Sequence, residues 1–355
     1  MKKQFAPLLA GLALLAACSP KTEETPTPAP TTGVFILSEG QYNAGDGAVS
    51  VFDKITKVLN VDAFGSANGG ARLGDVVQDM GVRGNKGYIV VNASRKIEVV
   101  SLPDFKSAGT FGGLDQPRYF TSTSATRGYV TEWRGSYTST PAYSPGVLSI
   151  LDLSTNAVIS RVTVGRNPEQ LLALGGKVYV PNSLENTVSV VDEATGTLAS
   201  TITVSDGPTN VVADKDGNVW VLCSGFVSYA TGVAVPLSNG SLVRFSPGSP
   251  ATQFKLTFPT TTGPSKLRIN PAKDQLYYKF GGAEYQMNIS ATALPTAPFI
   301  RRSFTGFAID PRDNTVFGAV STGYTTNGRF IRYQPTGVAI DSFTVKVGPN
   351  GFVFY

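Results

Sequence analysis

The feature that most restricts how this chain folds is a unit of four short strands that recurs along its length. Each unit starts at a Gly-Pro-like turn and an apolar strand, passes through a Gly/Asn/Asp turn into a β-branched or aromatic strand, and ends in two alternating strands. The clearest copies begin at Asn167-Pro168 and Gly207-Pro208. Strand periodicity repeated at this distance, with no helical pattern, predicts an architecture built from small sheets.

Alignment of the second strand of each unit accounts for seven units without a remainder. These strands fall at residues 34–38, 88–92, 129–132, 178–182, 219–223, 276–280 and 316–320. A spacing of roughly 40 to 55 residues is that of a four-stranded blade with its loops. Because one such sheet cannot bury both of its faces, the sheets must stack radially. We therefore predict an all-β, seven-bladed β-propeller of four-stranded blades.

The two ends of the repeat array complement each other. The first strand, at residues 34–38, has no inner strand ahead of it, whereas residues 348–355 are similar to the inner strands that start at Gly207-Pro208 and Gly263-Pro264. We expect the C-terminal strand to join the first blade and to close the ring, since closure protects the sheet edges.

The N-terminal segment has the layout of a secretory signal. Two lysines precede an apolar run that ends in Leu-Ala-Ala-Cys18, and the run is too short for an ordinary transmembrane helix. This ending resembles the lipobox of bacterial lipoproteins, which implies a signal peptide over residues 1–17 and lipid attachment at Cys18. A plain secretory signal is the alternative.

Residues 18–32 are rich in proline and threonine and lack residues that build a core. We expect a disordered tether there and the propeller over residues 33–355. Glu23 and Glu24 resemble the surface-export signal of lipoproteins in some Gram-negative bacteria. The expected location is the outer membrane, with the protein on the cell surface; a periplasm-facing position is the alternative.

Composition excludes several classes of chemistry. The chain has no histidine, which removes histidine-based triads, metal sites and haem ligation. It has no P-loop and no cysteine pair spaced for metal binding, and its basic residues are too scattered for a nucleic-acid stripe. Cys223, in an apolar strand, is expected to be buried. The carboxylates near the loops are expected to cap strands and join blades rather than to catalyse: Glu39, Asp79, Glu132, Glu169 and Glu185.

One face of the ring is the expected ligand site. The loops from second to third strands are long at residues 39–47, 132–146, 223–240 and 321–328 and carry aromatic and amide groups. Together with polar residues at the inner-strand entries, they suit a large, flat, amide- or hydroxyl-rich ligand. For each candidate residue taken alone, the alternative to ligand binding is a structural role in packing a loop or joining two blades. The candidates are Gln41, Tyr42, Arg118, Trp133, Arg134, Tyr137, Tyr143, Glu169, Asn182, Asn210, Phe226, Tyr229, Lys266 and Tyr324.

Two groups of motifs carry a family resemblance. The sequences YVPN at 179–182 and NTVSVVD at 186–192 resemble the YVTN or YncE-like propeller repeats, over residues 33–355. The sequences VFILSEG at 34–40, LGDV at 73–76 and QPRY at 116–119 are similar to surface lipoproteins of that family found beside TonB-dependent transporters. In the BtuG branch, such a protein captures cobalamin and passes it to its transporter. For this chain, that cargo is implied by analogy of fold only.

These observations predict a non-enzymatic cell-surface lipoprotein, without cofactor or metal, that captures a ligand on the loop face. The resemblance implies a corrinoid such as cobalamin as ligand and a TonB-dependent outer-membrane transporter as partner. Contact with the membrane is expected through the lipid anchor only, and none with nucleic acid. The alternatives are an extracellular protein-interaction or glycan-binding propeller and, less favoured, a lactonase-type enzyme with a carboxylate-bound metal.

Overall fold

The computed structural model describes Met1 and residues 33–134, 144–228 and 232–355. The chain divides into a unit over Met1–Thr31 and a compact unit over Thr32–Tyr355, which holds all the sheets. The predicted signal peptide, Cys18 and the tether lie outside the described residues. In the part of the chain that the structure describes, no helix is long and apolar enough to cross a membrane.

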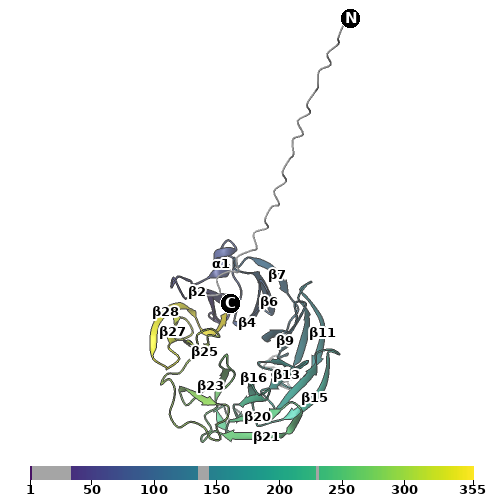
Figure 1. Cartoon of the computed structure of the whole chain (residues 1–355), viewed down its shortest axis with the longest axis vertical. Helices are drawn as coiled ribbons and strands as arrows, with labels where there is room; N and C mark the ends of the chain where they lie inside the picture. The colour runs from purple at the N-terminus through teal and green to yellow at the C-terminus, as the bar shows by residue number, and fades with distance from the viewer. Residues whose placement is uncertain (2–32, 135–143, 229–231) are drawn as a thin grey trace. The chain divides into compact units, whose positions relative to one another are not determined.

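Seven sheets follow one another around a central axis (Figure 1), which confirms the seven-bladed propeller. From the inside outwards, blade 1 contains β29 (Pro349–Phe354), β1 (Gly33–Ser38), β2 (Ala48–Asp53) and β3 (Leu59–Asn60). Blade 2 contains β4 (Val77–Arg83), β5 (Lys86–Val91), β6 (Lys96–Ser101) and β7 (Ser107–Phe111). Blade 3 contains β8 (Pro117–Ser122), β9 (Arg127–Glu132), β10 (Val147–Asp152) and β11 (Ala157–Thr163).

The other four blades continue in the same order. Blade 4 contains β12 (Leu172–Leu174), β13 (Lys177–Asn182), β14 (Thr187–Asp192) and β15 (Thr197–Thr203). Blade 5 contains β16 (Pro208–Ala213), β17 (Val219–Cys223), β20 (Ser241–Ser246) and β21 (Ser249–Thr257). Blade 6 contains β22 (Ser265–Ile269), β23 (Gln275–Phe280) and β24 (Ala283–Asn288). Blade 7 contains β25 (Gly306–Ile309), β26 (Val316–Val320), β27 (Asn327–Tyr333) and β28 (Ala339–Val347).

All seven predicted second strands are found within two residues of their expected ends, as β1, β5, β9, β13, β17, β23 and β26. Blade 6 differs from the repeat because its sheet has three strands. A five-residue helix, α1 (Ala63–Ala67), and a small hairpin of β18 (Val227–Ser228) and β19 (Val235–Pro236) also depart from the expectation. The helix is too short to leave a helical period in the sequence, and Asp62 caps it by accepting from the Gly65 amide at 2.9 Å.

The hydrophobic core lies in the seams between blades. In β13, Val178 and Val180 pack into the seam toward blade 3, whereas Tyr179 packs toward blade 5. Successive side chains of a strand point to opposite faces, so each strand of alternating apolar residues serves both neighbouring seams. Cys223 at the end of β17 is fully buried and free, as predicted.

Sharp turns lead into the inner strands, as the Gly-Pro-like signals predict. Asn167 and Gly207, each before a proline, have positive φ angles of 51° and 66°. The Pro168 ring lies against Gly146 of blade 3, where an added Cβ would come 2.3 Å from the Pro168 Cδ. A side chain at position 146 would therefore push the neighbouring blades apart.

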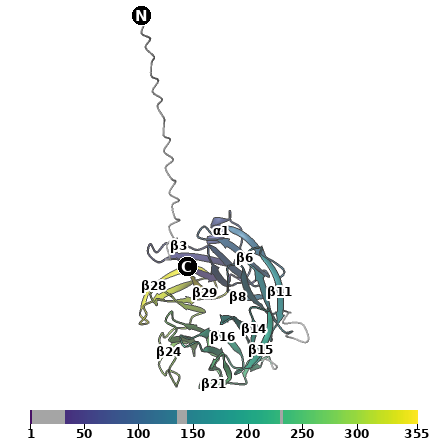
Figure 2. The same ribbon diagram turned by 45° about the vertical axis from the view of Figure 1, so that its right-hand side comes forward.

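The C-terminal strand closes the ring, as predicted. β29 pairs antiparallel with β1, in a register that places Phe354 opposite Val34, and Figure 2 shows the C-terminus beside β29, β28 and β3. The Tyr355 ring stacks on Phe35 with centroids 4.1 Å apart and planes at 3°. Phe352 packs against Phe317 of blade 7 at 5.7 Å, so β29 joins the last blade to the first.

Removal of residues 349–355 is expected to abolish cooperative folding. Truncation of one buried phenylalanine costs about 3 to 5 kcal/mol, and the deletion removes three aromatic rings and a full hydrogen-bonded strand from a fold whose net stability is on the order of 5 to 15 kcal/mol. Thermal unfolding followed by circular dichroism should lose its sharp transition, and an added synthetic peptide of residues 348–355 should restore it. A truncated chain that unfolds like the full one would contradict this account of closure.

Candidate functional site

One face of the ring carries the long insertions and is here called the loop face; the space around the axis between the inner strands (Figure 1) is called the channel, and its end on this face the channel mouth. Because the second strand runs in the same direction in every blade, all connections to third strands leave on this face. The side chains at the channel mouth come from the first residues of the inner strands. Those residues stand in β-bulges, with register shifts between Val77 and Asp79, Pro117 and Phe120, and Ser265 and Arg268. A bulge re-aims side chains, and the bulged residues here include Gln78, Arg118 and Lys266.

Arg118 is the centre of a cluster that joins three blades. Its Nη1 donates to Gln78 Oε1 of blade 2 at 2.6 Å, and its Nη2 lies 3.3 Å from Glu169 Oε2 of blade 4. The guanidinium lies over the Trp133 ring, 4.0 Å from its centroid, a geometry in which a cation is attracted to the aromatic face. We call Gln78, Arg118, Trp133 and Glu169 the Arg118 cluster.

Burial dominates the electrostatics of the cluster. The Glu169 side chain is 11% exposed and that of Arg118 is 16% exposed. Burial raises the pKa of Glu169, and the charge and hydrogen bonds of Arg118 oppose that rise. Arg118 and Glu169 thus neutralise each other in a poorly hydrated place, where an unpaired charge would lower the stability of the fold.

Two further charged groups, Asp79 and Arg268, stand on the inner strands β4 and β22. Asp79 accepts a hydrogen bond from the Phe120 amide of the next blade at 2.8 Å. Burial raises the pKa of Asp79 to about 6 against the effects of the Phe120 and Met80 amides and of Arg268 and Arg118. Burial likewise lowers the pKa of Arg268, which donates through Nε to the Phe307 carbonyl of blade 7 at 3.1 Å.

Lys266 is the unusual member of the channel mouth. It has a φ of 62°, in the left-handed region that favours glycine, and its backbone is held there by Asn210 Oδ1, which accepts from the Lys266 amide at 3.1 Å. No carboxylate among the described residues lies within ion-pair distance of its ammonium. Burial lowers the pKa of Lys266 to about 8, with Arg268 contributing and Glu39 and Glu169 opposing. Strain and a desolvated charge at one residue are typical of binding sites.

The structure brings four of the predicted site residues to the channel: Arg118, Trp133, Glu169 and Lys266. Two others have structural roles. Asn182 is fully buried, and its Nδ2 donates to Thr187 and Ser189 within its own blade. Asn210 Nδ2 donates to Gln170, and Asn210 Oδ1 accepts from the amides of Lys266 and Leu267. Asn210 therefore joins blades 4, 5 and 6.

The other candidates lie on the rim or beyond the described residues. Gln41, Tyr42, Arg134 and Tyr324 are exposed and Phe226 is half-buried. Tyr324 lines a cavity of about 220 Å³ with Glu39 and Asn350 at the seam of blades 7 and 1. The candidates Tyr137, Tyr143 and Tyr229 fall outside the described residues.

Sequence reasoning missed Gln78, Tyr119 and Arg268, which share the channel with Arg118. Gln78 Nε2 donates to the Tyr119 hydroxyl at 3.4 Å. These residues stand at the second, third and fourth positions of their inner strands, so polar residues near the start of those strands were the available signal. Only the residues nearest the prolines were predicted from that signal.

The loop-face carboxylates cap strands and join segments, as predicted. Glu132 accepts from the Asp115 amide and from Ser149, and Glu185 accepts from the Arg166 amide at 3.0 Å. Glu39 accepts from Asn350 Nδ2 at 3.0 Å. Within the described ranges, no group of three or more Cys, Asp or Glu side chains is placed to hold a metal ion.

Comparison with family models places the chain in a family. The model of the Domain of unknown function (DUF5074) family matches residues 32–228, more than half of the chain. The chain belongs to the DUF5074 family. A search of curated proteins finds no match.

Solved structures share the propeller fold of this DUF5074 protein. A quinonprotein alcohol dehydrogenase-like protein from Bacteroides thetaiotaomicron is 16% identical, with a TM-score of 0.67 over 91% of this chain and 78% of that one. A functionally unknown protein from Desulfotomaculum acetoxidans is 13% identical, with a TM-score of 0.65 over 91% and 98%. Kuenenia stuttgartiensis hydrazine synthase is 12% identical, with a TM-score of 0.61 over 84% and 95%. At these identities the likeness shows the fold alone.

Replacement of Lys266 by methionine is expected to stabilise the DUF5074 propeller at pH 7. The native pKa of about 8 lies below the ordinary 10.5, so the unfolded chain binds more protons between these values and the cost of the buried charge disappears as the pH rises through them. The gain at pH 7 should be about 1 to 3 kcal/mol; it should decrease as the pH rises above about 8 and vanish only above the unfolded pKa of 10.5, as measured by urea unfolding.

The matched control is Lys273→Met. Lys273 also has a positive φ, of 55°, and lies in the same blade, but it is exposed. Its replacement should change stability by less than about 0.5 kcal/mol. Destabilisation by Lys266→Met at pH 7 would mean that the ammonium has a stabilising partner.

Proposed function

We propose that this protein is a non-enzymatic lipoprotein that captures a polar small molecule at the channel mouth of its loop face. The observation that carries the proposal is Lys266, a strained and desolvated ammonium without an ion-pair partner among the described residues, beside the Arg118 cluster. A ligand carbonyl or phosphate would supply the partner that Lys266 lacks. Trp133, whose ring carries the Arg118 guanidinium, would contact the same ligand through the rest of its indole surface.

The insertions around the channel support the same proposal. The loops after β1 and β26 carry the exposed rings of Tyr42 and Tyr324, and the described parts of the loops after β9 and β17 carry the half-buried Trp133 and Phe226. Long ordered loops cost conformational entropy, and recognition is what such loops usually provide on a rigid scaffold. The proposed ligand is therefore larger than the channel mouth and touches both its polar floor and its aromatic rim.

The proposed cargo is a corrinoid such as cobalamin, and the proposed partner is a TonB-dependent outer-membrane transporter. Both rest on the resemblance of the motifs at 34–40, 73–76 and 116–119 to transporter-associated lipoproteins. A corrinoid is large, flat and rich in amides, which matches the mixture of Trp133, Arg118 and Lys266. The proposed location is the outer surface of the outer membrane, with a lipid on Cys18 and residues 19–32 as tether.

Cyanocobalamin is expected to bind residues 33–355 in isothermal titration calorimetry. Trp133→Ala and Lys266→Met should each weaken binding by about tenfold or more, as expected for anchor residues, whereas Lys273→Met should leave it unchanged. Affinity should also fall as the pH rises through about 8, because Lys266 then loses its charge. Absence of both heat and a thermal shift would remove the corrinoid version of the proposal.

Lipid attachment is expected to depend on Cys18. Cells that express the full chain should incorporate labelled palmitate into the protein and retain it with the membrane fraction, since several acyl chains give stable anchoring. The Cys18→Ser variant should lose the label and leave the membrane. Protease added to intact cells should digest the wild-type protein if it stands on the cell surface, whereas protection would place it on the periplasmic side.

A protein-interaction propeller is the second candidate. The β18–β19 insertion of blade 5 exposes a group of apolar side chains whose exposed fractions are 42% for Val227, 67% for Val233, 44% for Val235 and 65% for Leu237. Contiguous apolar side chains on a hairpin are suited to contact with another protein. Recovery of a transporter with this protein from detergent extracts, without any corrinoid binding, would favour this second candidate.

A further inference from the structure

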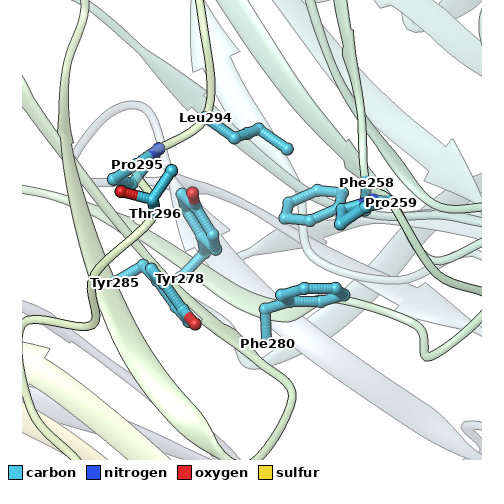
Figure 3. A pocket seen from close by; sticks show the side chains of 8 residues that line it. All are labelled: Phe258, Pro259, Tyr278, Phe280, Tyr285, Leu294, Pro295 and Thr296. Carbon is cyan, nitrogen blue, oxygen red and sulfur yellow. The ribbon is translucent and has the colours of Figure 1, made fainter.

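A cavity of about 280 Å³ lies at the seam of blades 5 and 6 (Figure 3). Its lining residues follow β21, belong to β23 and β24, or lie in the segment between β24 and β25, and none comes from an inner strand. The cavity is therefore separate from the channel mouth. We call it the aromatic cavity, lined by Phe258, Pro259, Tyr278, Phe280, Tyr285, Leu294, Pro295 and Thr296.

Four aromatic rings form most of its wall. Tyr278 and Tyr285 are nearly parallel, with planes at 8° and centroids 5.8 Å apart. Phe258 meets Tyr278 edge to face at 5.3 Å and 81°, and it lies 4.7 Å from Phe280 at 40°. The rings thus present both faces and edges to the hollow, and Leu294 and Pro295 lie across it from Phe280 (Figure 3).

Two departures from the blade repeat meet at this cavity. The second strands of blades 4 and 5 end in Asn182 and Cys223, which are fully buried, whereas that of blade 6 ends in Phe280, which is half-buried. Blade 6 is also the sheet without a fourth strand, and the chain after β24 instead places Leu294, Pro295 and Thr296 beside the rings. Phe280, Tyr285 and Leu294 pack against the core of this seam and also border the hollow, so both changes meet at the same place.

The lining selects for an uncharged ligand. It contains no lysine, arginine, aspartate or glutamate. Burial raises the pKa of Tyr278, so that its hydroxyl stays protonated at ordinary pH. The hydroxyls of Tyr278 and Tyr285 point in opposite directions (Figure 3) and leave the ring faces to bound the space. A bare cation would find no carboxylate here, and a sugar would find too few hydrogen-bonding groups for its hydroxyls.

Size and shape point to a flat group of one or two rings. An apolar cavity of about 150 Å³ is enough to hold benzene, and the aromatic cavity is nearly twice as large. Aromatic rings prefer offset-stacked or edge-to-face neighbours, and the existing rings supply both orientations. We propose that the aromatic cavity is a second ligand site, which binds a neutral planar aromatic group.

Indole is a suitable probe because it is neutral, flat and bicyclic. It is expected to bind residues 33–355 and to shift the NMR signals of Tyr278, Phe280 and Tyr285. Phe280→Ala should weaken binding by about tenfold or more. Thr296→Trp should block the cavity from its exposed rim without disturbing the core. The matched control is Phe299→Ala, a half-buried phenylalanine next to blade 6 that packs on Tyr277 and does not line the cavity; it should leave indole binding unchanged.

Several results would overturn this assignment. Absence of indole binding at millimolar concentration would do so, as would binding that survives both Phe280→Ala and Thr296→Trp. Tighter binding of tetramethylammonium or of glucose than of indole would show that the class of ligand is wrong. Lys266→Met should leave indole binding intact, so failure of the proposed channel-mouth function and failure of this second site can be told apart.

Discussion

The hydrogen-bonded ladder between β29 and β1 is the interaction on which the rest of the structure depends, because it turns a row of sheets into a ring. Its effect extends beyond blade 1. Asn350 in β29 donates to Glu39 and to the Val77 carbonyl, and so links the closing strand to the first long loop and to blade 2. Pro349 packs on Gly328 of blade 7, where an added Cβ would come 2.4 Å from the proline Cδ. Through these contacts the closing strand fixes the first inner strand beside those of blades 2 and 7.

Charge in the channel is a consequence of that arrangement of the inner strands. The inner strands converge and bury charged side chains. Burial raises the pKa values of Asp79 and Glu169 and lowers those of Lys266 and Arg268, and in each case it favours the neutral form. Three of these four groups have a partner in the next blade. Glu169 pairs with Arg118, Asp79 accepts from the Phe120 amide, and Arg268 donates to the Phe307 carbonyl. Lys266 has no such ion-pair partner among the described residues, so its positive charge at the channel mouth is not balanced by a neighbouring carboxylate. Charged residues of this kind commonly occur in binding sites, where a bound ligand supplies the missing partner.

The channel mouth and the aromatic cavity use the propeller differently. The first arises where the bulges of several inner strands re-aim polar side chains toward one axis. The second arises in a single seam, where the sheet of blade 6 has three strands and its second strand ends in Phe280. The likeness to propellers of other activities therefore says little about either site, since both are built from departures from the common repeat rather than from the repeat itself.

The sequence by itself determined the number of blades, the positions of the second strands, the closure by the last strand and the burial of Cys223, because strand alternation and turn residues act over a few neighbouring positions. The tertiary structure alone decided that Arg118 stacks on Trp133, that Asn182 and Asn210 bond within the scaffold, that Lys266 sits in a bulge at positive φ, and that four rings surround a hollow. These facts depend on residues far apart in the chain and on bulges and a missing strand that leave no periodic signal. The radial stacking of the blades decides which of these residues come into contact. The local sequence pattern carries no information about contacts between blades.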